Sequence, residues 1–184
     1  MTVIYVVLGI AVLVLVWGVA LFNKLVRHKN LVKEGWSGID VQLKRRANLI
    51  PNLIETVKGY MSHERELLTE VTELRSRAAD TDAPAEKGRI EGQISRLLGN
   101  LFAVAENYPD LKADQSFLDL QGQLGEIEEH IQLARRYYNG ATRDLNIIIE
   151  SFPSNIVANM FKFIQAEFFE IDEPGDRAVP KVSF

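Results

Sequence analysis

The sequence predicts an all-α protein in which one membrane-spanning helix precedes several long amphipathic helices. Residues 3–22 form an apolar run without a charged side chain, and roughly 20 apolar residues span the hydrocarbon core of a bilayer as a helix. Beyond this run, apolar residues recur at spacings of three and four, the period of a helix that packs on one face. No segment shows a convincing strand pattern.

The apolar run is predicted to be a retained anchor rather than a cleaved signal peptide. No basic residue precedes it, it is longer than a usual signal core, and no small-x-small cleavage site follows it. Because the basic residues lie after the span, we expect the N-terminus outside and the domain that follows in the cytoplasm. Four of them are candidate contacts for lipid headgroups, namely Lys24, Arg27, Lys29 and Lys33.

Charge is distributed unevenly along the chain, whose formal net charge is −4. Residues 24–46 hold seven basic and two acidic side chains, a local charge of +5 that leaves −9 for the rest. The basic segment either contacts anionic lipid or only sets the orientation of the span. The acidic charge of the remaining chain argues against nucleic acid as a partner. The chain has no cysteine, which excludes disulfides, thiolate nucleophiles and cysteine-held metals.

The first amphipathic helix is predicted to be long and continuous with the span. Its apolar positions run from Ile39 to Leu74 with one polar interruption at Glu64. We therefore expect a single helix that reaches about Ala78.

Pro51 lies inside this predicted helix and should bend or break it, because proline cannot donate a hydrogen bond to the carbonyl of Ala47. Asn48 and Asn52 flank the defect. Their amides either satisfy the freed backbone groups or form a polar site inside a bundle.

Two further long helices follow the first. The turn at residues 79–83 leads into a predicted helix from Pro84 to about Glu106. Asp114 or Ser116 is predicted to cap the next helix. That helix shows an unbroken heptad pattern, which packs either within the chain or between chains. The seam consists of Phe117, Leu120, Leu124, Ile127, Ile131, Ala134, Tyr138, Ala141, Leu145, Ile148 and Phe152.

A shorter fourth helix is predicted after Pro153, with Ser154 or Asn155 as its cap. It has more apolar surface than a small bundle needs, which marks an interface, a contact with the first helix or a contact with lipid headgroups. The apolar residues are Ile156, Met160, Phe161, Phe163, Ile164, Phe168 and Phe169. Residues 172–184 are too polar and broken for another helix and are expected to form an extended tail.

No pattern of catalytic or metal-binding residues emerges from the sequence. His63 is not part of a His-Glu-x-x-His zinc motif, because Leu67 occupies the position of the second ligand. Glu126, Glu128 and Glu129 face different directions on a helix, which is typical of a solvated surface rather than a catalytic pair. We therefore expect no enzymatic activity, no cofactor and no metal.

Three segments together closely resemble the LemA family of bacterial membrane proteins. They are RHKNLVKEGWSGIDVQLKRRANLIPNLIETVKGYMSHE (27–64), AENYPDLKA (105–113) and ARRYYNGATRDLNIIIESFPSN (134–155). The resemblance implies an antiparallel bundle of three to four long helices behind one transmembrane helix, in a bacterial inner (plasma) membrane. We accordingly divide the chain into an anchor (1–23), a cytoplasmic bundle (24–171) and an extended tail (172–184).

The family has no established enzymatic reaction; members have been linked to antigen presentation in one pathogen and to magnetosome membrane formation. The resemblance also points to individual residues, many of them polar, on helices that should otherwise pack. These are Trp36, Asp40, Arg45, Arg46, Asn48, Pro51, Asn52, His63, Asn107, Tyr108, Arg135, Tyr138, Asn139, Asn146 and Phe152. They form a hydrogen-bond network that sets bundle register, a partner-binding or self-assembly face, or a ligand pocket.

Two functions are compatible with these observations. The first is an anchored helical scaffold that associates with copies of itself and shapes the membrane beneath it. The second is a regulatory adaptor for another membrane protein, such as a metallopeptidase or a transporter.

Overall fold

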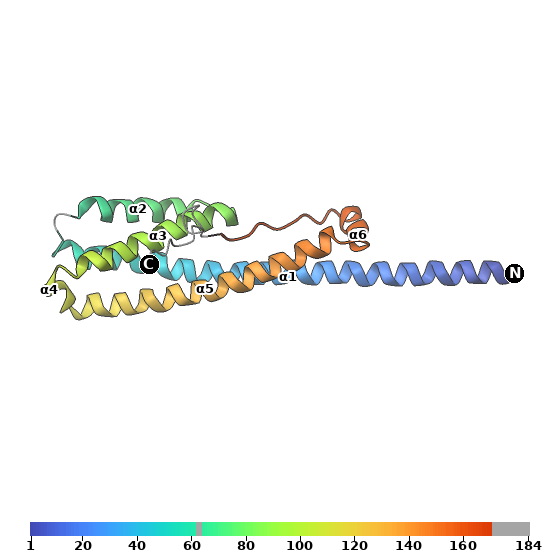
Figure 1. Cartoon of the computed structure of the whole chain (residues 1–184), viewed down its shortest axis with the longest axis horizontal. Coiled ribbons are helices and arrows are strands. Elements are labelled where there is room, and N and C mark those ends of the chain that lie inside the picture. Colours follow the sequence, from blue (N-terminus) through green and yellow to red (C-terminus); the bar gives the residue numbers. More distant parts are fainter. Residues whose placement is uncertain (62–63, 171–184) are drawn as a thin grey trace, which may run out of the picture. The chain divides into compact units, whose positions relative to one another are not determined.

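The computed structural model describes residues 1–61 and 64–170, and within them it contains six helices and no strand (Figure 1). The predicted all-α class is therefore confirmed. The helices are α1 (Thr2–Lys58), α2 (Arg65–Ala79), α3 (Pro84–Ala105), α4 (Pro109–Lys112), α5 (Gln115–Glu150) and α6 (Ser154–Met160). The predicted tail at residues 172–184 lies outside the described residues.

The chain divides into two compact units, and helices α1 and α5 contribute to both. The first unit comprises Met1–Ser37 and Arg136–Glu167. The second comprises Gly38–Arg135 together with the described residues from Phe168 onward.

The second unit is an antiparallel bundle of four helical segments, taken from α1, α2, α3 and α5. The chain reverses direction at each connection between them (Figure 1). Their apolar faces meet in one core, as the helical periodicity predicts. Fully buried members of this core include Ile50, Leu53, Val57, Met61, Val71, Ile94, Leu101, Leu111 and Phe117.

The long first helix predicted from the sequence is wrong beyond Lys58. Helix α1 ends there, and α2 begins at Arg65 with Glu64 as its N-cap residue. The apolar period continues across the break because Met61 and Leu68, on either side of it, are buried in the same core.

Pro51 is accommodated inside α1 by a side chain from α2. The carbonyl oxygen of Ala47, which loses its donor to the proline, accepts a hydrogen bond from Nε of Arg75 at 2.7 Å. Asn48 and Asn52 are exposed on either side. Arg75, rather than an asparagine amide, therefore provides the donor for this carbonyl.

Helix α5 begins where the sequence predicted. The backbone N–H of Phe117 donates to Oδ1 of Asp114 at 3.0 Å, the hydrogen bond of an N-cap. In the second unit, the seam residues of α5 are buried within the chain, including Ile127 and Ile131. The seam does not extend to Phe152, because α5 ends at Glu150 and the Phe152 side chain is 80% exposed.

The first unit contains the apolar run predicted to be an anchor. This part of α1 has a mean hydropathy of 2.8 over its most apolar 18-residue window, and none of that window is buried. Among the described helices, α1 alone is long and apolar enough to cross a membrane. Residues 3–22 are therefore the candidate anchor.

Beyond the anchor, α1 packs closely against α5 within the first unit. A Cβ atom added to Gly35 would lie 3.0 Å from Cα of Tyr138 and 3.1 Å from the Tyr137 ring. The absence of a side chain at Gly35 lets the two backbones approach. Leu25 and Val32 of α1 are buried, as are Leu145 and Ile148 of α5, among the first unit's apolar residues.

The fourth helix predicted to reach Phe169 is also wrong in its extent. Helix α6 ends at Met160, and Lys162 takes a left-handed backbone conformation with φ of 56°. Beyond that point, α5 side chains bind the backbone in place of helical hydrogen bonds. Asn146 donates to the Ala166 carbonyl and accepts from the Ala166 N–H, both at 2.9 Å.

The Tyr138 hydroxyl holds the same segment by donating to the Glu167 carbonyl at 2.7 Å. Burial raises the pKa of this phenol. The side chains of α5 thus fix the course of residues 166 and 167.

In the second unit, the end of this segment crosses α3 at a glycine. A Cβ atom added to Gly88 would clash with the Glu170 carbonyl oxygen and would lie 3.1 Å from the Glu170 nitrogen. The neighbouring Phe169 is fully buried. A residue without a side chain is therefore required at position 88.

We predict that Gly88→Ala destabilises the docked segment, whereas Gly99→Ala on the same helix does not. The first change forces the Glu170 backbone away, at a cost of about 1 to 3 kcal/mol. The second places its methyl group in open space and should stabilise α3 by up to about 1 kcal/mol. Chemical denaturation and hydrogen exchange of residues 166–170 measure both effects. Equal stability and equal protection in the two variants would contradict this packing.

Candidate functional site

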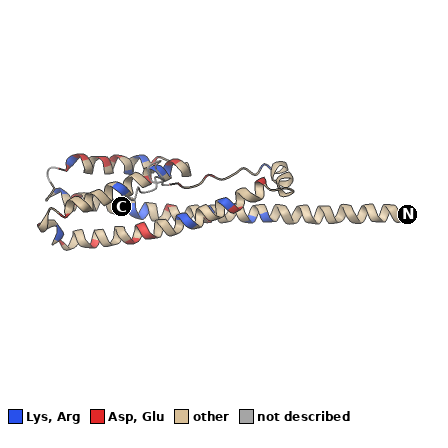
Figure 2. Ribbon diagram, in the orientation of Figure 1, with Lys and Arg blue, Asp and Glu red and all other residues tan. Residues whose placement is uncertain are grey.

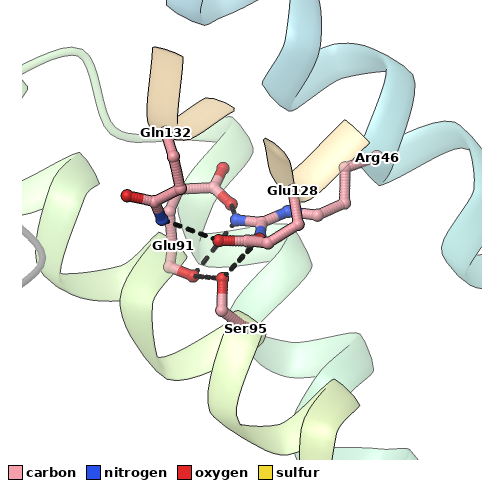
Figure 3. Close-up of polar contacts among 5 residues, drawn as sticks. All are labelled: Arg46, Glu91, Ser95, Glu128 and Gln132. Atoms are coloured by element: carbon pink, nitrogen blue, oxygen red, sulfur yellow. Dashed lines mark hydrogen bonds and ion pairs between the residues drawn. The ribbon is translucent and has the colours of Figure 1, made fainter. Parts of the chain in front are cut away.

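A buried arginine lies at the centre of the polar contacts in the second unit (Figure 3). Only 2% of the surface of Arg46, on α1, is exposed. Its Nη2 atom pairs with the Glu91 carboxylate of α3 and donates to the Glu91 carbonyl at 3.1 Å. Its Nη1 atom donates to Ser95 Oγ at 2.6 Å and to Glu128 Oε2 of α5 at 2.7 Å. One guanidinium group thus joins three helices.

The partners of Arg46 are themselves held in place. Ser95 Oγ also lies 2.9 Å from Glu128 Oε2, and the Gln132 amide donates to Glu128 Oε1 at 2.8 Å (Figure 3). Glu91 is 4% exposed, so both of its oxygens have largely lost contact with water. Nε of Arg46 is buried without a hydrogen-bond partner among the described residues.

This geometry can orient helices but offers little for chemistry. A planar guanidinium presents several donors in fixed directions, and buried charges are tolerated only when they are paired and hydrogen-bonded. Sliding any of the three helices would leave a carboxylate or the guanidinium buried without its partner. The network thus favours one alignment of α1, α3 and α5.

Four members of this network were not singled out in the sequence. Glu128 was grouped with the solvated residues Glu126 and Glu129, but its Oε2 atom contacts Arg46. Glu91, Ser95 and Gln132 were not considered. A signal was present, because Glu91 lies three residues before buried Ile94, within the apolar stripe of α3. A charged residue in a packed stripe requires a partner.

A cavity of about 500 Å³ lies beside the network, between α1, α2 and α3 of the second unit. Its charged lining includes Lys44 and Lys87, and both ammonium groups face the Asp40 carboxylate, at 2.6 and 3.6 Å. Arg75 also lines it. Asp40, one of the residues indicated by the family resemblance, also lines this cavity.

The other indicated residues are distributed among several environments. In the first unit, the rings of Trp36 and Tyr138 lie 5.6 Å apart, Asn146 binds residue 166, and Asn139 is half-buried. In the second unit, Arg135 and Pro51 are half-buried, and Tyr108 packs against the core. Residues exposed to solvent are Arg45, Asn48, Asn52, Asn107 and Phe152. His63 lies outside the described residues.

The predicted headgroup contacts follow the anchor along α1. Figure 2 shows the first part of α1 without charged residues and basic residues after it. Lys24, Arg27, Lys29 and Lys33 are all exposed. Over the described part of the chain, no group of three or more histidine or acidic residues could hold a metal ion.

We predict that Arg46→Met lowers the free energy of unfolding by about 3 to 5 kcal/mol, because it leaves the Glu91 carboxylate buried without its counter-charge. The double variant Arg46→Met/Glu91→Met should recover much of that loss, since an apolar pair can replace a buried ion pair. Lys44→Met removes an exposed ion pair and should cost less than about 1 kcal/mol. Denaturation of the intact chain in mild detergent measures all three. A double variant no more stable than Arg46→Met would refute this role for the charge.

Comparison with known proteins gives relatives of several kinds. Protein LemA of Metamycoplasma hominis is 29% identical over 155 residues, covering 82% of this chain and 69% of that protein. Magnetosome protein MamQ 2 of Paramagnetospirillum magneticum is 25% identical over 169 residues, and magnetosome protein MamQ of Magnetospirillum gryphiswaldense is 21% identical. Each MamQ alignment covers 78% of this chain and 62% of the relative, so the chain spans less than two thirds of those proteins.

The names of these relatives denote no enzymatic activity, and two of them denote magnetosome proteins. The model of the LemA family matches residues 35–184, which include the Arg46 network, all of the second unit and about half of the first. The chain therefore belongs to the LemA family.

Proposed function

We propose that this protein is a membrane-anchored helical scaffold that associates with copies of itself and has no catalytic activity of its own. The observation that carries the proposal is the exposed apolar surface of α5. Leu118 and Leu133 in the second unit, and Tyr137 and Ile147 in the first, are each between 44 and 52% exposed. Exposed apolar residues that gather on one element are typical of an interface.

Glycines on the same helix support this proposal. Gly122 and Gly125 lie between Leu118 and Leu133, and a Cβ atom at either would meet no atom within 4 Å. At 100° per residue, these four positions fall within about 80° of one another around the helix. Each glycine weakens an isolated helix by up to about 1 kcal/mol relative to alanine. Their absence of side chains would let a second helix approach closely.

The orientation of the anchor is a second part of the proposal. The exposed basic residues that follow the span favour a cytoplasmic location for the rest of the chain, with the N-terminus outside a bacterial plasma membrane. Similarity to magnetosome proteins supports a role at a membrane. In this location the scaffold would assemble along the inner surface of the membrane and shape it.

We predict that cysteine labelling will place Thr2, at the start of α1, and Ser116, on α5, on opposite sides of the membrane. The chain contains no cysteine, so Thr2→Cys and Ser116→Cys each introduce a single thiol at an exposed position. A membrane-impermeant maleimide should label Thr2→Cys in intact cells and Ser116→Cys only after permeabilisation. Labelling of Ser116→Cys in sealed cells would reverse the orientation and remove any cytoplasmic partner.

We predict that the intact chain forms an oligomer in mild detergent and that Leu118→Glu/Leu133→Glu reduces it to a monomer. Both side chains are about half exposed, so the folded chain should tolerate the change, whereas a charge in a packed interface is not tolerated. Val41→Glu, at an equally exposed site on α1, is the matched control and should remain oligomeric. Light scattering gives the mass, and circular dichroism verifies the fold.

A monomeric wild-type chain at micromolar concentration would contradict self-association. If that monomer instead co-purified in fixed ratio with a different membrane protein, such as a metallopeptidase or a transporter, the adaptor function would replace the scaffold.

A further inference from the structure

The first unit carries a second apolar surface, on and around α6. Five large apolar side chains there are exposed by between 51 and 82%. They are Phe152, Ile156, Met160, Phe161 and Ile164, and we refer to them as the α6 tip. In α6 itself, Ile156 and Met160 are four residues apart and share one face, whereas Val157 and Ala158 are buried. The helix therefore has one face packed on its own unit and one face of apolar residues left uncovered.

Ring contacts place the α6 tip beside the end of the anchor. Phe22, the last residue of the apolar run, lies 4.7 Å from the Phe161 ring and 5.9 Å from the Phe163 ring, measured between centroids. The apolar run ends where α1 leaves the hydrocarbon core, so a group that touches Phe22 lies at the level of the lipid headgroups. The tip is thus positioned against the bilayer by its own anchor.

Charge around the tip matches a lipid surface. From Ser151 to Ala166 the only charged side chain is Lys162, which is exposed. Lys29 places its ammonium group 5.7 Å from the Phe163 ring, and Lys24 and Arg27 are exposed on the same part of α1. Basic residues near a membrane surface are attracted to anionic lipid. Short apolar faces bordered by lysine are typical of elements that lie in the bilayer interface.

We propose that the α6 tip inserts into the headgroup and acyl boundary of the leaflet from which α1 emerges, and that its ligand is anionic lipid. The first unit then has two attachments to the membrane, the anchor and the tip, which together restrict its rotation about α1. The α6 tip is distinct from the exposed apolar surface of α5. This proposal rests on the anchor of the proposed function, but not on self-association.

The side chains suited to a lipid surface are also those least suited to water. Phe152 and Ile164 are at least 80% exposed, and each would gain most from leaving water, since the gain is proportional to the apolar area removed. A second copy of this chain is the competing occupant. Binding of a second copy would not explain why the tip contacts Phe22 or why basic residues surround it, whereas binding of lipid explains both.

The test measures the depth of the tip in the bilayer with the full chain. Ile156→Cys and, as the matched control, Leu118→Cys on α5 each introduce one exposed thiol into the cysteine-free chain. Each variant is labelled with an environment-sensitive fluorophore and reconstituted into vesicles of phosphatidylcholine and phosphatidylglycerol that carry brominated acyl chains. We expect quenching at position 156 to be at least about three-fold stronger than at position 118, with blue-shifted emission at position 156.

One further variant and a cross-linking measurement decide between lipid and protein. Adding Phe152→Ser, Met160→Ser and Ile164→Ser to Ile156→Cys should reduce the quenching to that of the control, while circular dichroism remains unchanged because the residues are exposed. Equal quenching at positions 156 and 118 would overturn the proposal. Strong emission shifts without quenching, together with cross-links between copies at position 156, would assign the tip to self-association instead. The topology and mass measurements above are independent of these results.

Discussion

The buried charge of Arg46 is the constraint on which the alignment of the second unit depends. An apolar core tolerates small sliding movements, since one aliphatic contact can replace another, but a guanidinium group withdrawn from water cannot exchange partners freely. Arg46 reaches Glu91 on α3 and Glu128 on α5, and Ser95 of α3 lies within hydrogen-bond distance of both Arg46 and Glu128. The network therefore restricts how three helices can align, beyond what apolar packing alone requires.

Contacts with the backbone also restrict how the helices and the segment after α6 can pack. Pro51 leaves the Ala47 carbonyl without its helical hydrogen-bond donor. Arg75 of α2 donates to this carbonyl instead, which connects α2 to α1 beside the proline. Gly35 and Gly88 allow close approach in the first and second units respectively, and a methyl group at either would force a neighbour to move. The side chains of Asn146 and Tyr138 then hold an extended segment that has no helical hydrogen bonds of its own. Polar side chains thus act mainly on backbone and on other helices.

Because these polar residues stabilise the fold, the exposed apolar surfaces are the candidates for a functional role. Most of the large exposed apolar residues beyond the anchor occur on α5 and around α6, and their settings differ. Those on α5 accompany glycines and suit another helix, whereas those around α6 lie against Phe22 among basic residues and suit lipid. A scaffold at a membrane requires both kinds of surface, one for further copies and one to control orientation. The relatives named as LemA and magnetosome proteins are compatible with such a role.

The sequence by itself determined the features that depend on neighbours along the chain. The anchor, the helical class, the start of α3, the Asp114 cap and the apolar stripes all follow from local composition and period. Family resemblance added the antiparallel bundle and indicated Arg46 without its partners. Only the tertiary structure decided where α1 and α6 end, and which carboxylates pair with Arg46. Met61 and Leu68 continue one apolar period across a chain reversal because both enter the same core, so periodicity could not reveal the break. Residues beyond Met160 leave the helix because α5 binds their backbone, and a contact made 20 residues away leaves no local pattern.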